Sequence, residues 1–115
     1  MAQSHKPIIW GPFAAGGTLA AFVIPVLIFV TGIAVPLGIL PPESLSYQRA
    51  VAFAGTWLGK MILFVFVALP SWHAAHRARI TVHDLGVRAD MFVAGTVYSI
   101  AAIITIIAVV ALLRM

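Results

Sequence analysis

Three long apolar runs dominate the chain, and they restrict it to folds that a lipid bilayer surrounds. They cover residues 17–40, 47–72 and 91–113, and the first and third contain no charged residue. A helix needs about 20 consecutive apolar residues to cross the hydrocarbon core of a bilayer, so each run is long enough to span. The sequence therefore predicts an all-α membrane protein with three transmembrane helices and a short N-terminal interfacial segment. We expect residues 1–115 to form a single membrane domain.

The composition supports this class and excludes several others. Hydrophobic residues make up 63% of the chain and charged residues 9%, which leaves too few polar groups to cover a soluble domain of this size. The absence of cysteine excludes disulfides, iron–sulfur ligation and c-type haem attachment by this chain. The net charge of +4 comes from scattered basic residues, so nucleic acid is not an expected partner.

The basic residues between the spans predict the orientation of the chain. Three crossings place the N-terminus and the loop between the second and third spans on one side of the bilayer. That side carries Lys6, Arg77, Arg79 and Arg88, whereas the opposite side carries Arg49 and Arg114. Because loops with an excess of Lys and Arg stay in the cytoplasm, we expect a cytoplasmic N-terminus.

A cluster of histidine and arginine side chains follows the second span. On a helix, the offsets between His73, His76 and Arg77 place all three on one face, and His83 shares that face if the helix persists. Arg77 keeps its charge and polarises a carbonyl oxygen, while histidine exchanges protons near neutral pH. We therefore take His73, His76 and His83 as candidates for proton transfer. The alternative is that these residues are interfacial anchors, which are common at cytoplasmic helix ends.

A second cluster, Trp10 to Phe13, precedes the first span. The indole N–H of Trp10 is a hydrogen-bond donor on an apolar body that suits one end of a ring-shaped ligand. Gly11, Gly16 and Gly17 allow close backbone approach. The alternative for Trp10 is an aromatic residue of the membrane interface. Three crossings bring both clusters to the same membrane–water boundary, where they would hold a polar-headed, lipid-tailed molecule such as a quinone.

Lys60 interrupts the second span near its middle, where a charge is costly. The three apolar runs contain no Asp or Glu to pair with it, so we regard Lys60 as an intramembrane charge of unknown role.

The histidines also decide whether this chain could bind haem. A b-type haem takes axial ligands from facing helices, and this chain alone does not supply both. The possibility that His73 or His76 provides one ligand, with the other from another chain, stays open.

The order and spacing of short motifs resemble those of the D subunit of bacterial fumarate reductase, one of two small membrane anchors in a quinol:fumarate oxidoreductase. The matching segments are Trp10-Gly11-x-Phe13-x-x-Gly16-Gly17, Pro25-Val26, Pro36-Leu37-Gly38, Leu45-Ser46-Tyr47-x-Arg49, Ala52-Phe53-Ala54, Leu69-Pro70-x-Trp72, His76-Arg77 and His83-Asp84-Leu85. They extend over nearly the whole chain, although the third span matches by topology only.

The resemblance implies a subunit without catalytic activity of its own. Such anchors attach a flavoprotein subunit, which holds FAD, and an iron–sulfur subunit to the bacterial inner membrane, beside a second small membrane anchor, the C subunit. A menaquinol or related quinone binds at a site shared with other subunits. The pocket residues of the family correspond to Trp10, Phe13, His76 and Arg77, and Ala14 lines the same pocket where we expect a glycine. No haem or other cofactor is expected on this chain alone.

Two alternatives stay open. The anchors of succinate dehydrogenase share the architecture and perform the same chemistry in reverse, so the net direction is undetermined. A purely structural anchor would leave the quinone site to other chains. A small transporter is disfavoured, because no intramembrane carboxylate is available for proton coupling and no inverted repeat is visible.

Lys60 stands where a relative carries arginine. The lysine keeps the positive charge but lacks the forked hydrogen-bond donors of arginine.

Overall fold

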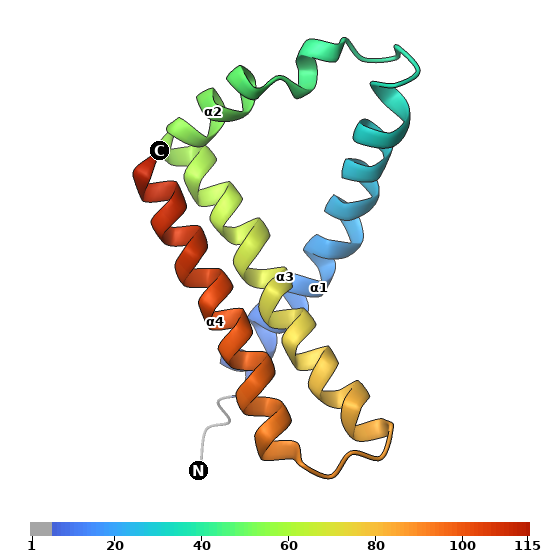
Figure 1. Cartoon of the computed structure of the whole chain (residues 1–115), viewed down its shortest axis with the longest axis vertical. Helices are drawn as coiled ribbons and strands as arrows, with labels where there is room; N and C mark the ends of the chain where they lie inside the picture. The colour runs from blue at the N-terminus through green and yellow to red at the C-terminus, as the bar shows by residue number, and fades with distance from the viewer. Residues whose placement is uncertain (1–5) are drawn as a thin grey trace.

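Helices account for most of the chain in the computed structural model, which describes residues 6–115 (Figure 1). In chain order the elements are α1 (Lys6–Phe29), the π-helical turn η1 (Val30–Ala34), the 3₁₀ turn η2 (Pro42–Leu45), α2 (Tyr47–Gly55), α3 (Trp57–Asp84) and α4 (Asp90–Arg114). No strand occurs within the described residues. Three helical segments are long and apolar enough to cross a membrane, namely Trp10–Ala34, Trp57–Asp84 and Asp90–Arg114. The predicted all-α fold with three spans is confirmed.

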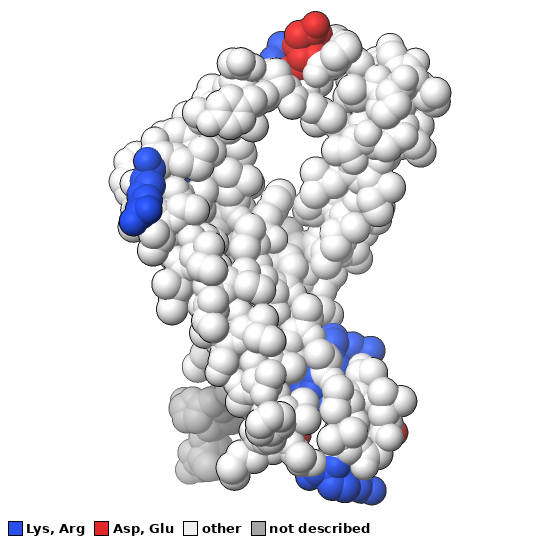
Figure 2. Space-filling model, in the orientation of Figure 1, with Lys and Arg blue, Asp and Glu red and all other residues white. Residues whose placement is uncertain are grey.

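The central helix of the molecule is α3, which packs against both α1 and α4. α4 runs antiparallel to α3, and α1 crosses α3 near its middle and then diverges from it (Figure 1). At the end where they diverge, η2 and α2 connect the two helices, and Figure 2 shows an opening between these segments. Lys and Arg side chains lie toward the two ends of the molecule, with an apolar band between them (Figure 2). The longest dimension is 53 Å, which exceeds the roughly 30 Å thickness of a hydrocarbon core.

Small residues form the contacts between the helices. Among the described residues, the buried hydrophobic side chains are all alanines: Ala34, Ala54, Ala68, Ala75 and Ala101. Gly16 and Gly17 lie where α1 crosses α3, and a methyl group at Gly16 would overlap the carbonyl oxygen of Leu69. Inside a membrane, close backbone approach stabilises helix pairs because burial from water no longer drives their association. The close backbone approach expected at Gly16 and Gly17 is found between α1 and α3, whereas a methyl group at Gly11 would meet no atom within 4 Å.

The first helix begins earlier than expected. α1 starts at Lys6 rather than near residue 17, so the expected interfacial segment is helical from Lys6 onward. Residues 1–5 lie outside the described part of the chain. Trp10 is consequently part of the first spanning helix.

The second predicted span, 47–72, is divided by a corner at Thr56. Thr56 has an extended backbone (φ −83°, ψ 150°), and its hydroxyl accepts a hydrogen bond of 2.9 Å from the amide of Gly59. This arrangement is an N-cap, which starts a new helix. A methyl group at Gly59 would overlap the carbonyl oxygen of Phe53, so the corner requires glycine there. The residues before the corner form α2, and the spanning helix begins at Trp57.

The corner changes the position of Lys60. Because α3 starts at Trp57, Lys60 lies in its first turn rather than in the middle of a span. The ammonium nitrogen of Lys60 lies 6.0 Å from the centre of the Trp57 ring. A lysine this close to a helix end can extend its charged group to the aqueous boundary, so the cost of a charge at the bilayer centre is avoided.

We expect the substitution Gly59→Ala to destabilise the corner between α2 and α3. The added methyl group has to displace the Phe53 carbonyl, and overpacking of this kind costs about 1–3 kcal/mol. The melting temperature of the detergent-purified protein should therefore fall. Gly55→Ala is the matched control, because a methyl group there meets no atom within 4 Å. Equal melting temperatures for the two variants would contradict the role given to Gly59.

Candidate functional site

The second half of α3 carries the predicted histidine cluster. The helix passes through Pro70 without ending and continues to Asp84. The expected helical extension beyond the second span is therefore confirmed, and it reaches further than the cluster itself. Because α1 and α4 both pack against α3, side chains of this extension meet residues from the two other spanning helices.

A cavity of about 380 Å³ lies between α1, α3 and α4. Its lining residues are Ile8, Trp10, Pro12, Phe13, Trp72, His76 and Tyr98. The volume falls within the roughly 300–1,000 Å³ that is typical of small-molecule sites. Three of the predicted site residues, Trp10, Phe13 and His76, thus line one cavity although they come from distant parts of the chain. Trp10 is 64% exposed, so the cavity opens toward the outside of this chain.

Phe13 connects the two predicted clusters. Its ring stacks on the imidazole of His73, with centroids 4.4 Å apart and an angle of 19° between the planes. It also meets the imidazole of His76 edge-on at 4.6 Å and the indole of Trp10 at 5.9 Å. Aromatic pairs prefer these offset and edge-on arrangements, so Phe13 holds the wall of the cavity in one conformation.

His73 joins α3 to α1 rather than lining the cavity. Its Nδ1–H donates a hydrogen bond of 2.9 Å to the carbonyl oxygen of Phe13, and a carbonyl can only accept, so Nδ1 carries the proton. Gly17 provides the space for the ring, since a methyl group there would lie 2.5 Å from Cε1 of His73. The structure therefore gives His73 a packing role, and its proposed part in proton transfer rests on sequence alone.

His76 is hydrogen-bonded to a residue that the sequence motifs did not single out. Its Nδ1 lies 2.8 Å from the hydroxyl oxygen of Tyr98 on α4. Tyr98 lies about 12 Å along α4 from Asp90, at 1.5 Å per residue. The pair therefore lies inside the apolar length of α4 and not at its end. A tyrosine within an otherwise apolar span needs a polar partner, and that was the signal for Tyr98 in the sequence.

Trp72 is the second lining residue that sequence reasoning missed as part of the site. Its indole N–H donates a hydrogen bond of 3.0 Å to the hydroxyl of Thr105 on α4. Its ring stacks against Tyr98, with centroids 6.0 Å apart and an angle of 22° between the planes. Trp72 and Tyr98 thus form the α3–α4 wall of the cavity opposite Phe13.

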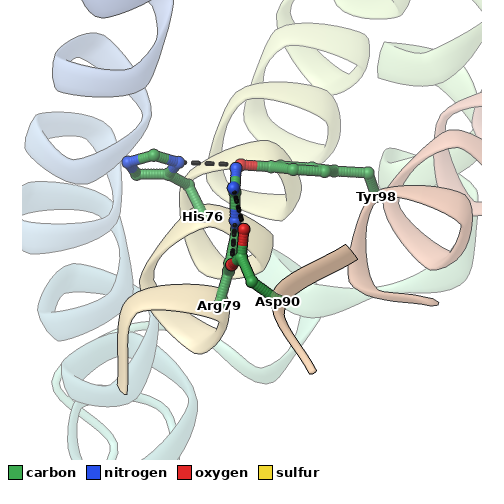
Figure 3. Close-up of polar contacts among 4 residues, drawn as sticks. All are labelled: His76, Arg79, Asp90 and Tyr98. Atoms are coloured by element: carbon green, nitrogen blue, oxygen red, sulfur yellow. Dashed lines mark hydrogen bonds and ion pairs between the residues drawn. The ribbon is translucent and has the colours of Figure 1, made fainter. Parts of the chain in front are cut away.

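An ion pair lies between this wall and the loop that joins α3 to α4. Nε of Arg79 donates to one carboxylate oxygen of Asp90 at 2.8 Å, and a terminal nitrogen donates to the other at 2.5 Å. The guanidinium carbon of Arg79 lies 6.0 Å from the centre of the Tyr98 ring. Figure 3 shows these residues together with His76, with the guanidinium beside the tyrosine hydroxyl. The two-pronged geometry fixes the guanidinium in place.

A second hollow, of about 300 Å³, adjoins this ion pair. It is lined by His76, Arg79, Ile80, His83 and Asp90. His76 therefore borders both the cavity and the second hollow, and His83 shares the second with it because the helix continues to Asp84. His76 and His83 thus share one face as expected, whereas His73 packs against α1 and Arg77 is exposed.

The other two predicted quinone-binding residues, Arg77 and Ala14, do not line the cavity. Arg77 is exposed, and it makes no hydrogen bond or ion pair with another described side chain. Ala14 is half-buried and lies beside Phe13 without reaching the cavity. Lys60 lies at the opposite end of α3, where a hollow of about 170 Å³ is lined by side chains that include Trp57 and Leu112. Within residues 6–115, no three His, Cys, Asp or Glu side chains group as metal ligands.

Comparisons with known proteins agree with the motifs. Residues 1–113 match the family described as the D subunit of fumarate reductase. The chain belongs to this family. The fumarate reductase D subunit from Vibrio parahaemolyticus is 41% identical over 108 residues, which cover 94% of this chain and 86% of the relative. The one from Aliivibrio fischeri is 39% identical over 94% and 90% of the two chains, and the one from Haemophilus ducreyi is 35% identical over 92% and 93%.

Membership of the fumarate reductase D subunit family confirms the resemblance carried by the motifs from Trp10 to Leu85. It agrees with three apolar helices of spanning length, so the chain is a bacterial membrane protein of this family. The matched region includes all three helices. The third span, which offered little recognisable motif, is therefore part of the family match.

In this member of the fumarate reductase D subunit family, we expect Gly17→Ala to weaken the crossing of α1 and α3. The methyl group would push the His73 ring away from Phe13 and lengthen its hydrogen bond to the Phe13 carbonyl. The midpoint of thermal unfolding in detergent should fall, by an amount that corresponds to about 1–3 kcal/mol. Gly32→Ala, where a methyl group meets no atom within 4 Å, should leave the midpoint unchanged or slightly higher. A midpoint for Gly17→Ala that equals the Gly32→Ala value would rule this role out.

Proposed function

We propose that this protein is a non-catalytic anchor subunit of a quinol:fumarate reductase complex in the bacterial inner membrane. It attaches a flavoprotein subunit, which holds FAD, and an iron–sulfur subunit to the bilayer, together with a second small membrane anchor, the C subunit. Support comes from the name of its family and from the three apolar helices. The basic residues Arg77, Arg79 and Arg88 lie at or near the end where α3 meets α4, which favours a cytoplasmic location for that end and for the N-terminus.

We further infer that the cavity between α1, α3 and α4 forms part of the quinol site. One observation carries this inference: Trp10 and Phe13 of α1 and His76 of α3 line the same cavity, with Trp72 and Tyr98 completing its wall. Aromatic side chains suit the apolar faces of a quinone ring. The indole N–H of Trp10 and the imidazole of His76 supply the few polar groups that orient a ligand.

The proposed chemistry is the two-electron oxidation of a quinol. Trp10 donates a hydrogen bond to one quinol oxygen, whose own proton leaves to a group of a partner subunit. His76 takes the proton from the other hydroxyl, and both oxygens become carbonyls. An iron–sulfur cluster held by the partner subunit would accept the two electrons one at a time. Arg77, which is exposed in this chain, is free to meet the head group or a partner subunit from outside and to stabilise the developing negative charge.

The same site would serve the reverse reaction in a succinate dehydrogenase anchor. The cavity and its side chains suit either direction, and it is the family name that favours fumarate reduction. His83 borders the hollow next to His76, and we propose that it takes protons onward. Ala14, which is half-buried and follows Phe13 in α1, supports the wall of the quinol site rather than lining it directly.

We expect Trp10→Phe to reduce the rate of quinol oxidation by the assembled complex about tenfold, which corresponds to the free energy of one lost hydrogen bond. His76→Asn should reduce it by roughly 10²-fold, because the proton acceptor is lost. The measurement is quinol:fumarate turnover in membranes, normalised to complex content. Reduction of fumarate by an artificial soluble donor, which bypasses the quinol site, should be unchanged in both variants.

Trp57→Phe is the matched control for Trp10→Phe, since Trp57 is an exposed tryptophan at the opposite end of α3. It should leave quinol turnover within about twofold of wild type, which is less than the loss of one hydrogen bond would cause. If Trp10→Phe and His76→Asn lowered only the amount of assembled complex and not its turnover, the quinol site would belong to other chains. The anchor role would then stand without it.

A further inference from the structure

We propose that Tyr98 is a positioning residue that fixes which ring nitrogen His76 presents to the cavity. This inference rests on the quinol site proposed above and extends it to a residue of α4, the helix that carries the least recognisable motif. It concerns Tyr98 as a group that acts through His76 rather than one that reacts with the quinol.

The contact itself assigns the two nitrogens of His76 to different surroundings. Nδ1 lies 2.8 Å from the Tyr98 hydroxyl, and the other ring nitrogen points away from Tyr98 (Figure 3). Among the side chains that the structure describes, none forms a hydrogen bond with Nε2 of His76. Since His76 lines the cavity, Nε2 is the nitrogen that is available to a bound molecule.

A partner at one imidazole nitrogen determines what the other can do. A neutral imidazole has one donor and one acceptor nitrogen, and the hydrogen bond at the first sets the tautomer at the second. For Nε2 to act as the acceptor, Nδ1 has to carry the proton and donate it to the oxygen of Tyr98, and this hydrogen bond persists after proton uptake. When Nε2 accepts the quinol proton, the quinol O–H bond breaks, an Nε2–H bond forms, and Nδ1–H donates to the oxygen of Tyr98.

Tyr98 is itself held on two sides. Trp72 stacks against its ring, and the guanidinium of Arg79 lies 6.0 Å from the ring centre. Asp90 in turn holds Arg79 with two hydrogen bonds. A hydroxyl fixed in this way keeps the imidazole in one orientation without further reorganisation when a proton moves.

Among the described side chains, the charged and titratable groups around His76 come from two helices. α4 contributes Tyr98 and Asp90, and α3 contributes Arg79 and His83 across the second hollow. The described neighbour from α1 is Phe13, whose ring carries no charge. Because His76 borders both hollows, a proton accepted on the cavity side reaches groups that lie nearer the end of the bundle.

Tyr98→Phe tests the proposal, because it removes the hydroxyl and keeps the ring that packs on Trp72. In the assembled complex we expect kcat for quinol oxidation to fall about tenfold, the value of one hydrogen bond, with KM for the quinol changed less than about threefold. The pH profile of kcat/KM should also shift. Thr96→Val is the matched control, since it deletes a hydroxyl from the same helix that bonds only the Phe92 carbonyl of its own turn. It should change neither kcat nor the pH profile.

The combination of Tyr98→Phe with His76→Asn separates positioning from general packing. If Tyr98 acts through His76, the double variant should turn over no more slowly than His76→Asn alone, because the group to be positioned is already gone. Losses that multiply in the double variant, or an unchanged pH profile for Tyr98→Phe, would overturn the proposal.

The failure of this inference is distinguishable from the failure of the quinol site. Normal turnover in Tyr98→Phe together with impaired turnover in Trp10→Phe and His76→Asn would leave the site and remove only Tyr98 from it. Normal turnover in all three variants would contradict both the quinol site and the positioning role of Tyr98. The soluble-donor assay and the content of assembled complex verify in each case that folding and the partner subunits are intact.

Discussion

The crossing of α1 and α3 at Gly16 and Gly17 is the contact on which the rest of the structure depends. Without side chains at these positions, α1 approaches the Leu69 carbonyl and the His73 ring closely enough for His73 to bond the Phe13 carbonyl. That approach sets Phe13 between two imidazoles and brings Trp10 to the edge of the same cavity. A bilayer offers no hydrophobic driving force for helix pairing, so shape and a few hydrogen bonds decide where the helices meet.

Three polar pairs join α3 to α4, and two of them lie within the apolar length of the bundle. Trp72 bonds Thr105, His76 bonds Tyr98 and Arg79 bonds Asp90, and the three pairs fix the antiparallel register of α3 and α4. Interhelical hydrogen bonds in membranes contribute about 0.6 kcal/mol each on average. These bonds therefore do more to fix the register of the two helices than to stabilise the fold. The same pairs form the wall of the cavity and lead from it toward the end of the bundle.

Much of the architecture could be predicted from the sequence, because hydropathy and length govern which segments cross a membrane. The three spans and the shared location of Trp10 and His76 follow from counting crossings, and the structure agrees. The corner at Thr56 was missed, because a run of apolar residues hides an N-cap that depends on Gly59 fitting against the Phe53 carbonyl. Helical periodicity grouped Arg77 with His76, but it did not predict that α1 and α4 would contact His76 and leave Arg77 exposed.

By itself the sequence determined the class of fold, the number of crossings and the family to which the chain belongs, since these depend on composition, length and the order of motifs. Only the tertiary structure decided which polar residues meet. Tyr98, Trp72 and the Arg79–Asp90 pair join the site through contacts between helices that are distant along the chain. Such contacts depend on the angle and register of packed helices, and these follow from the fit of small residues at the crossings rather than from any local pattern.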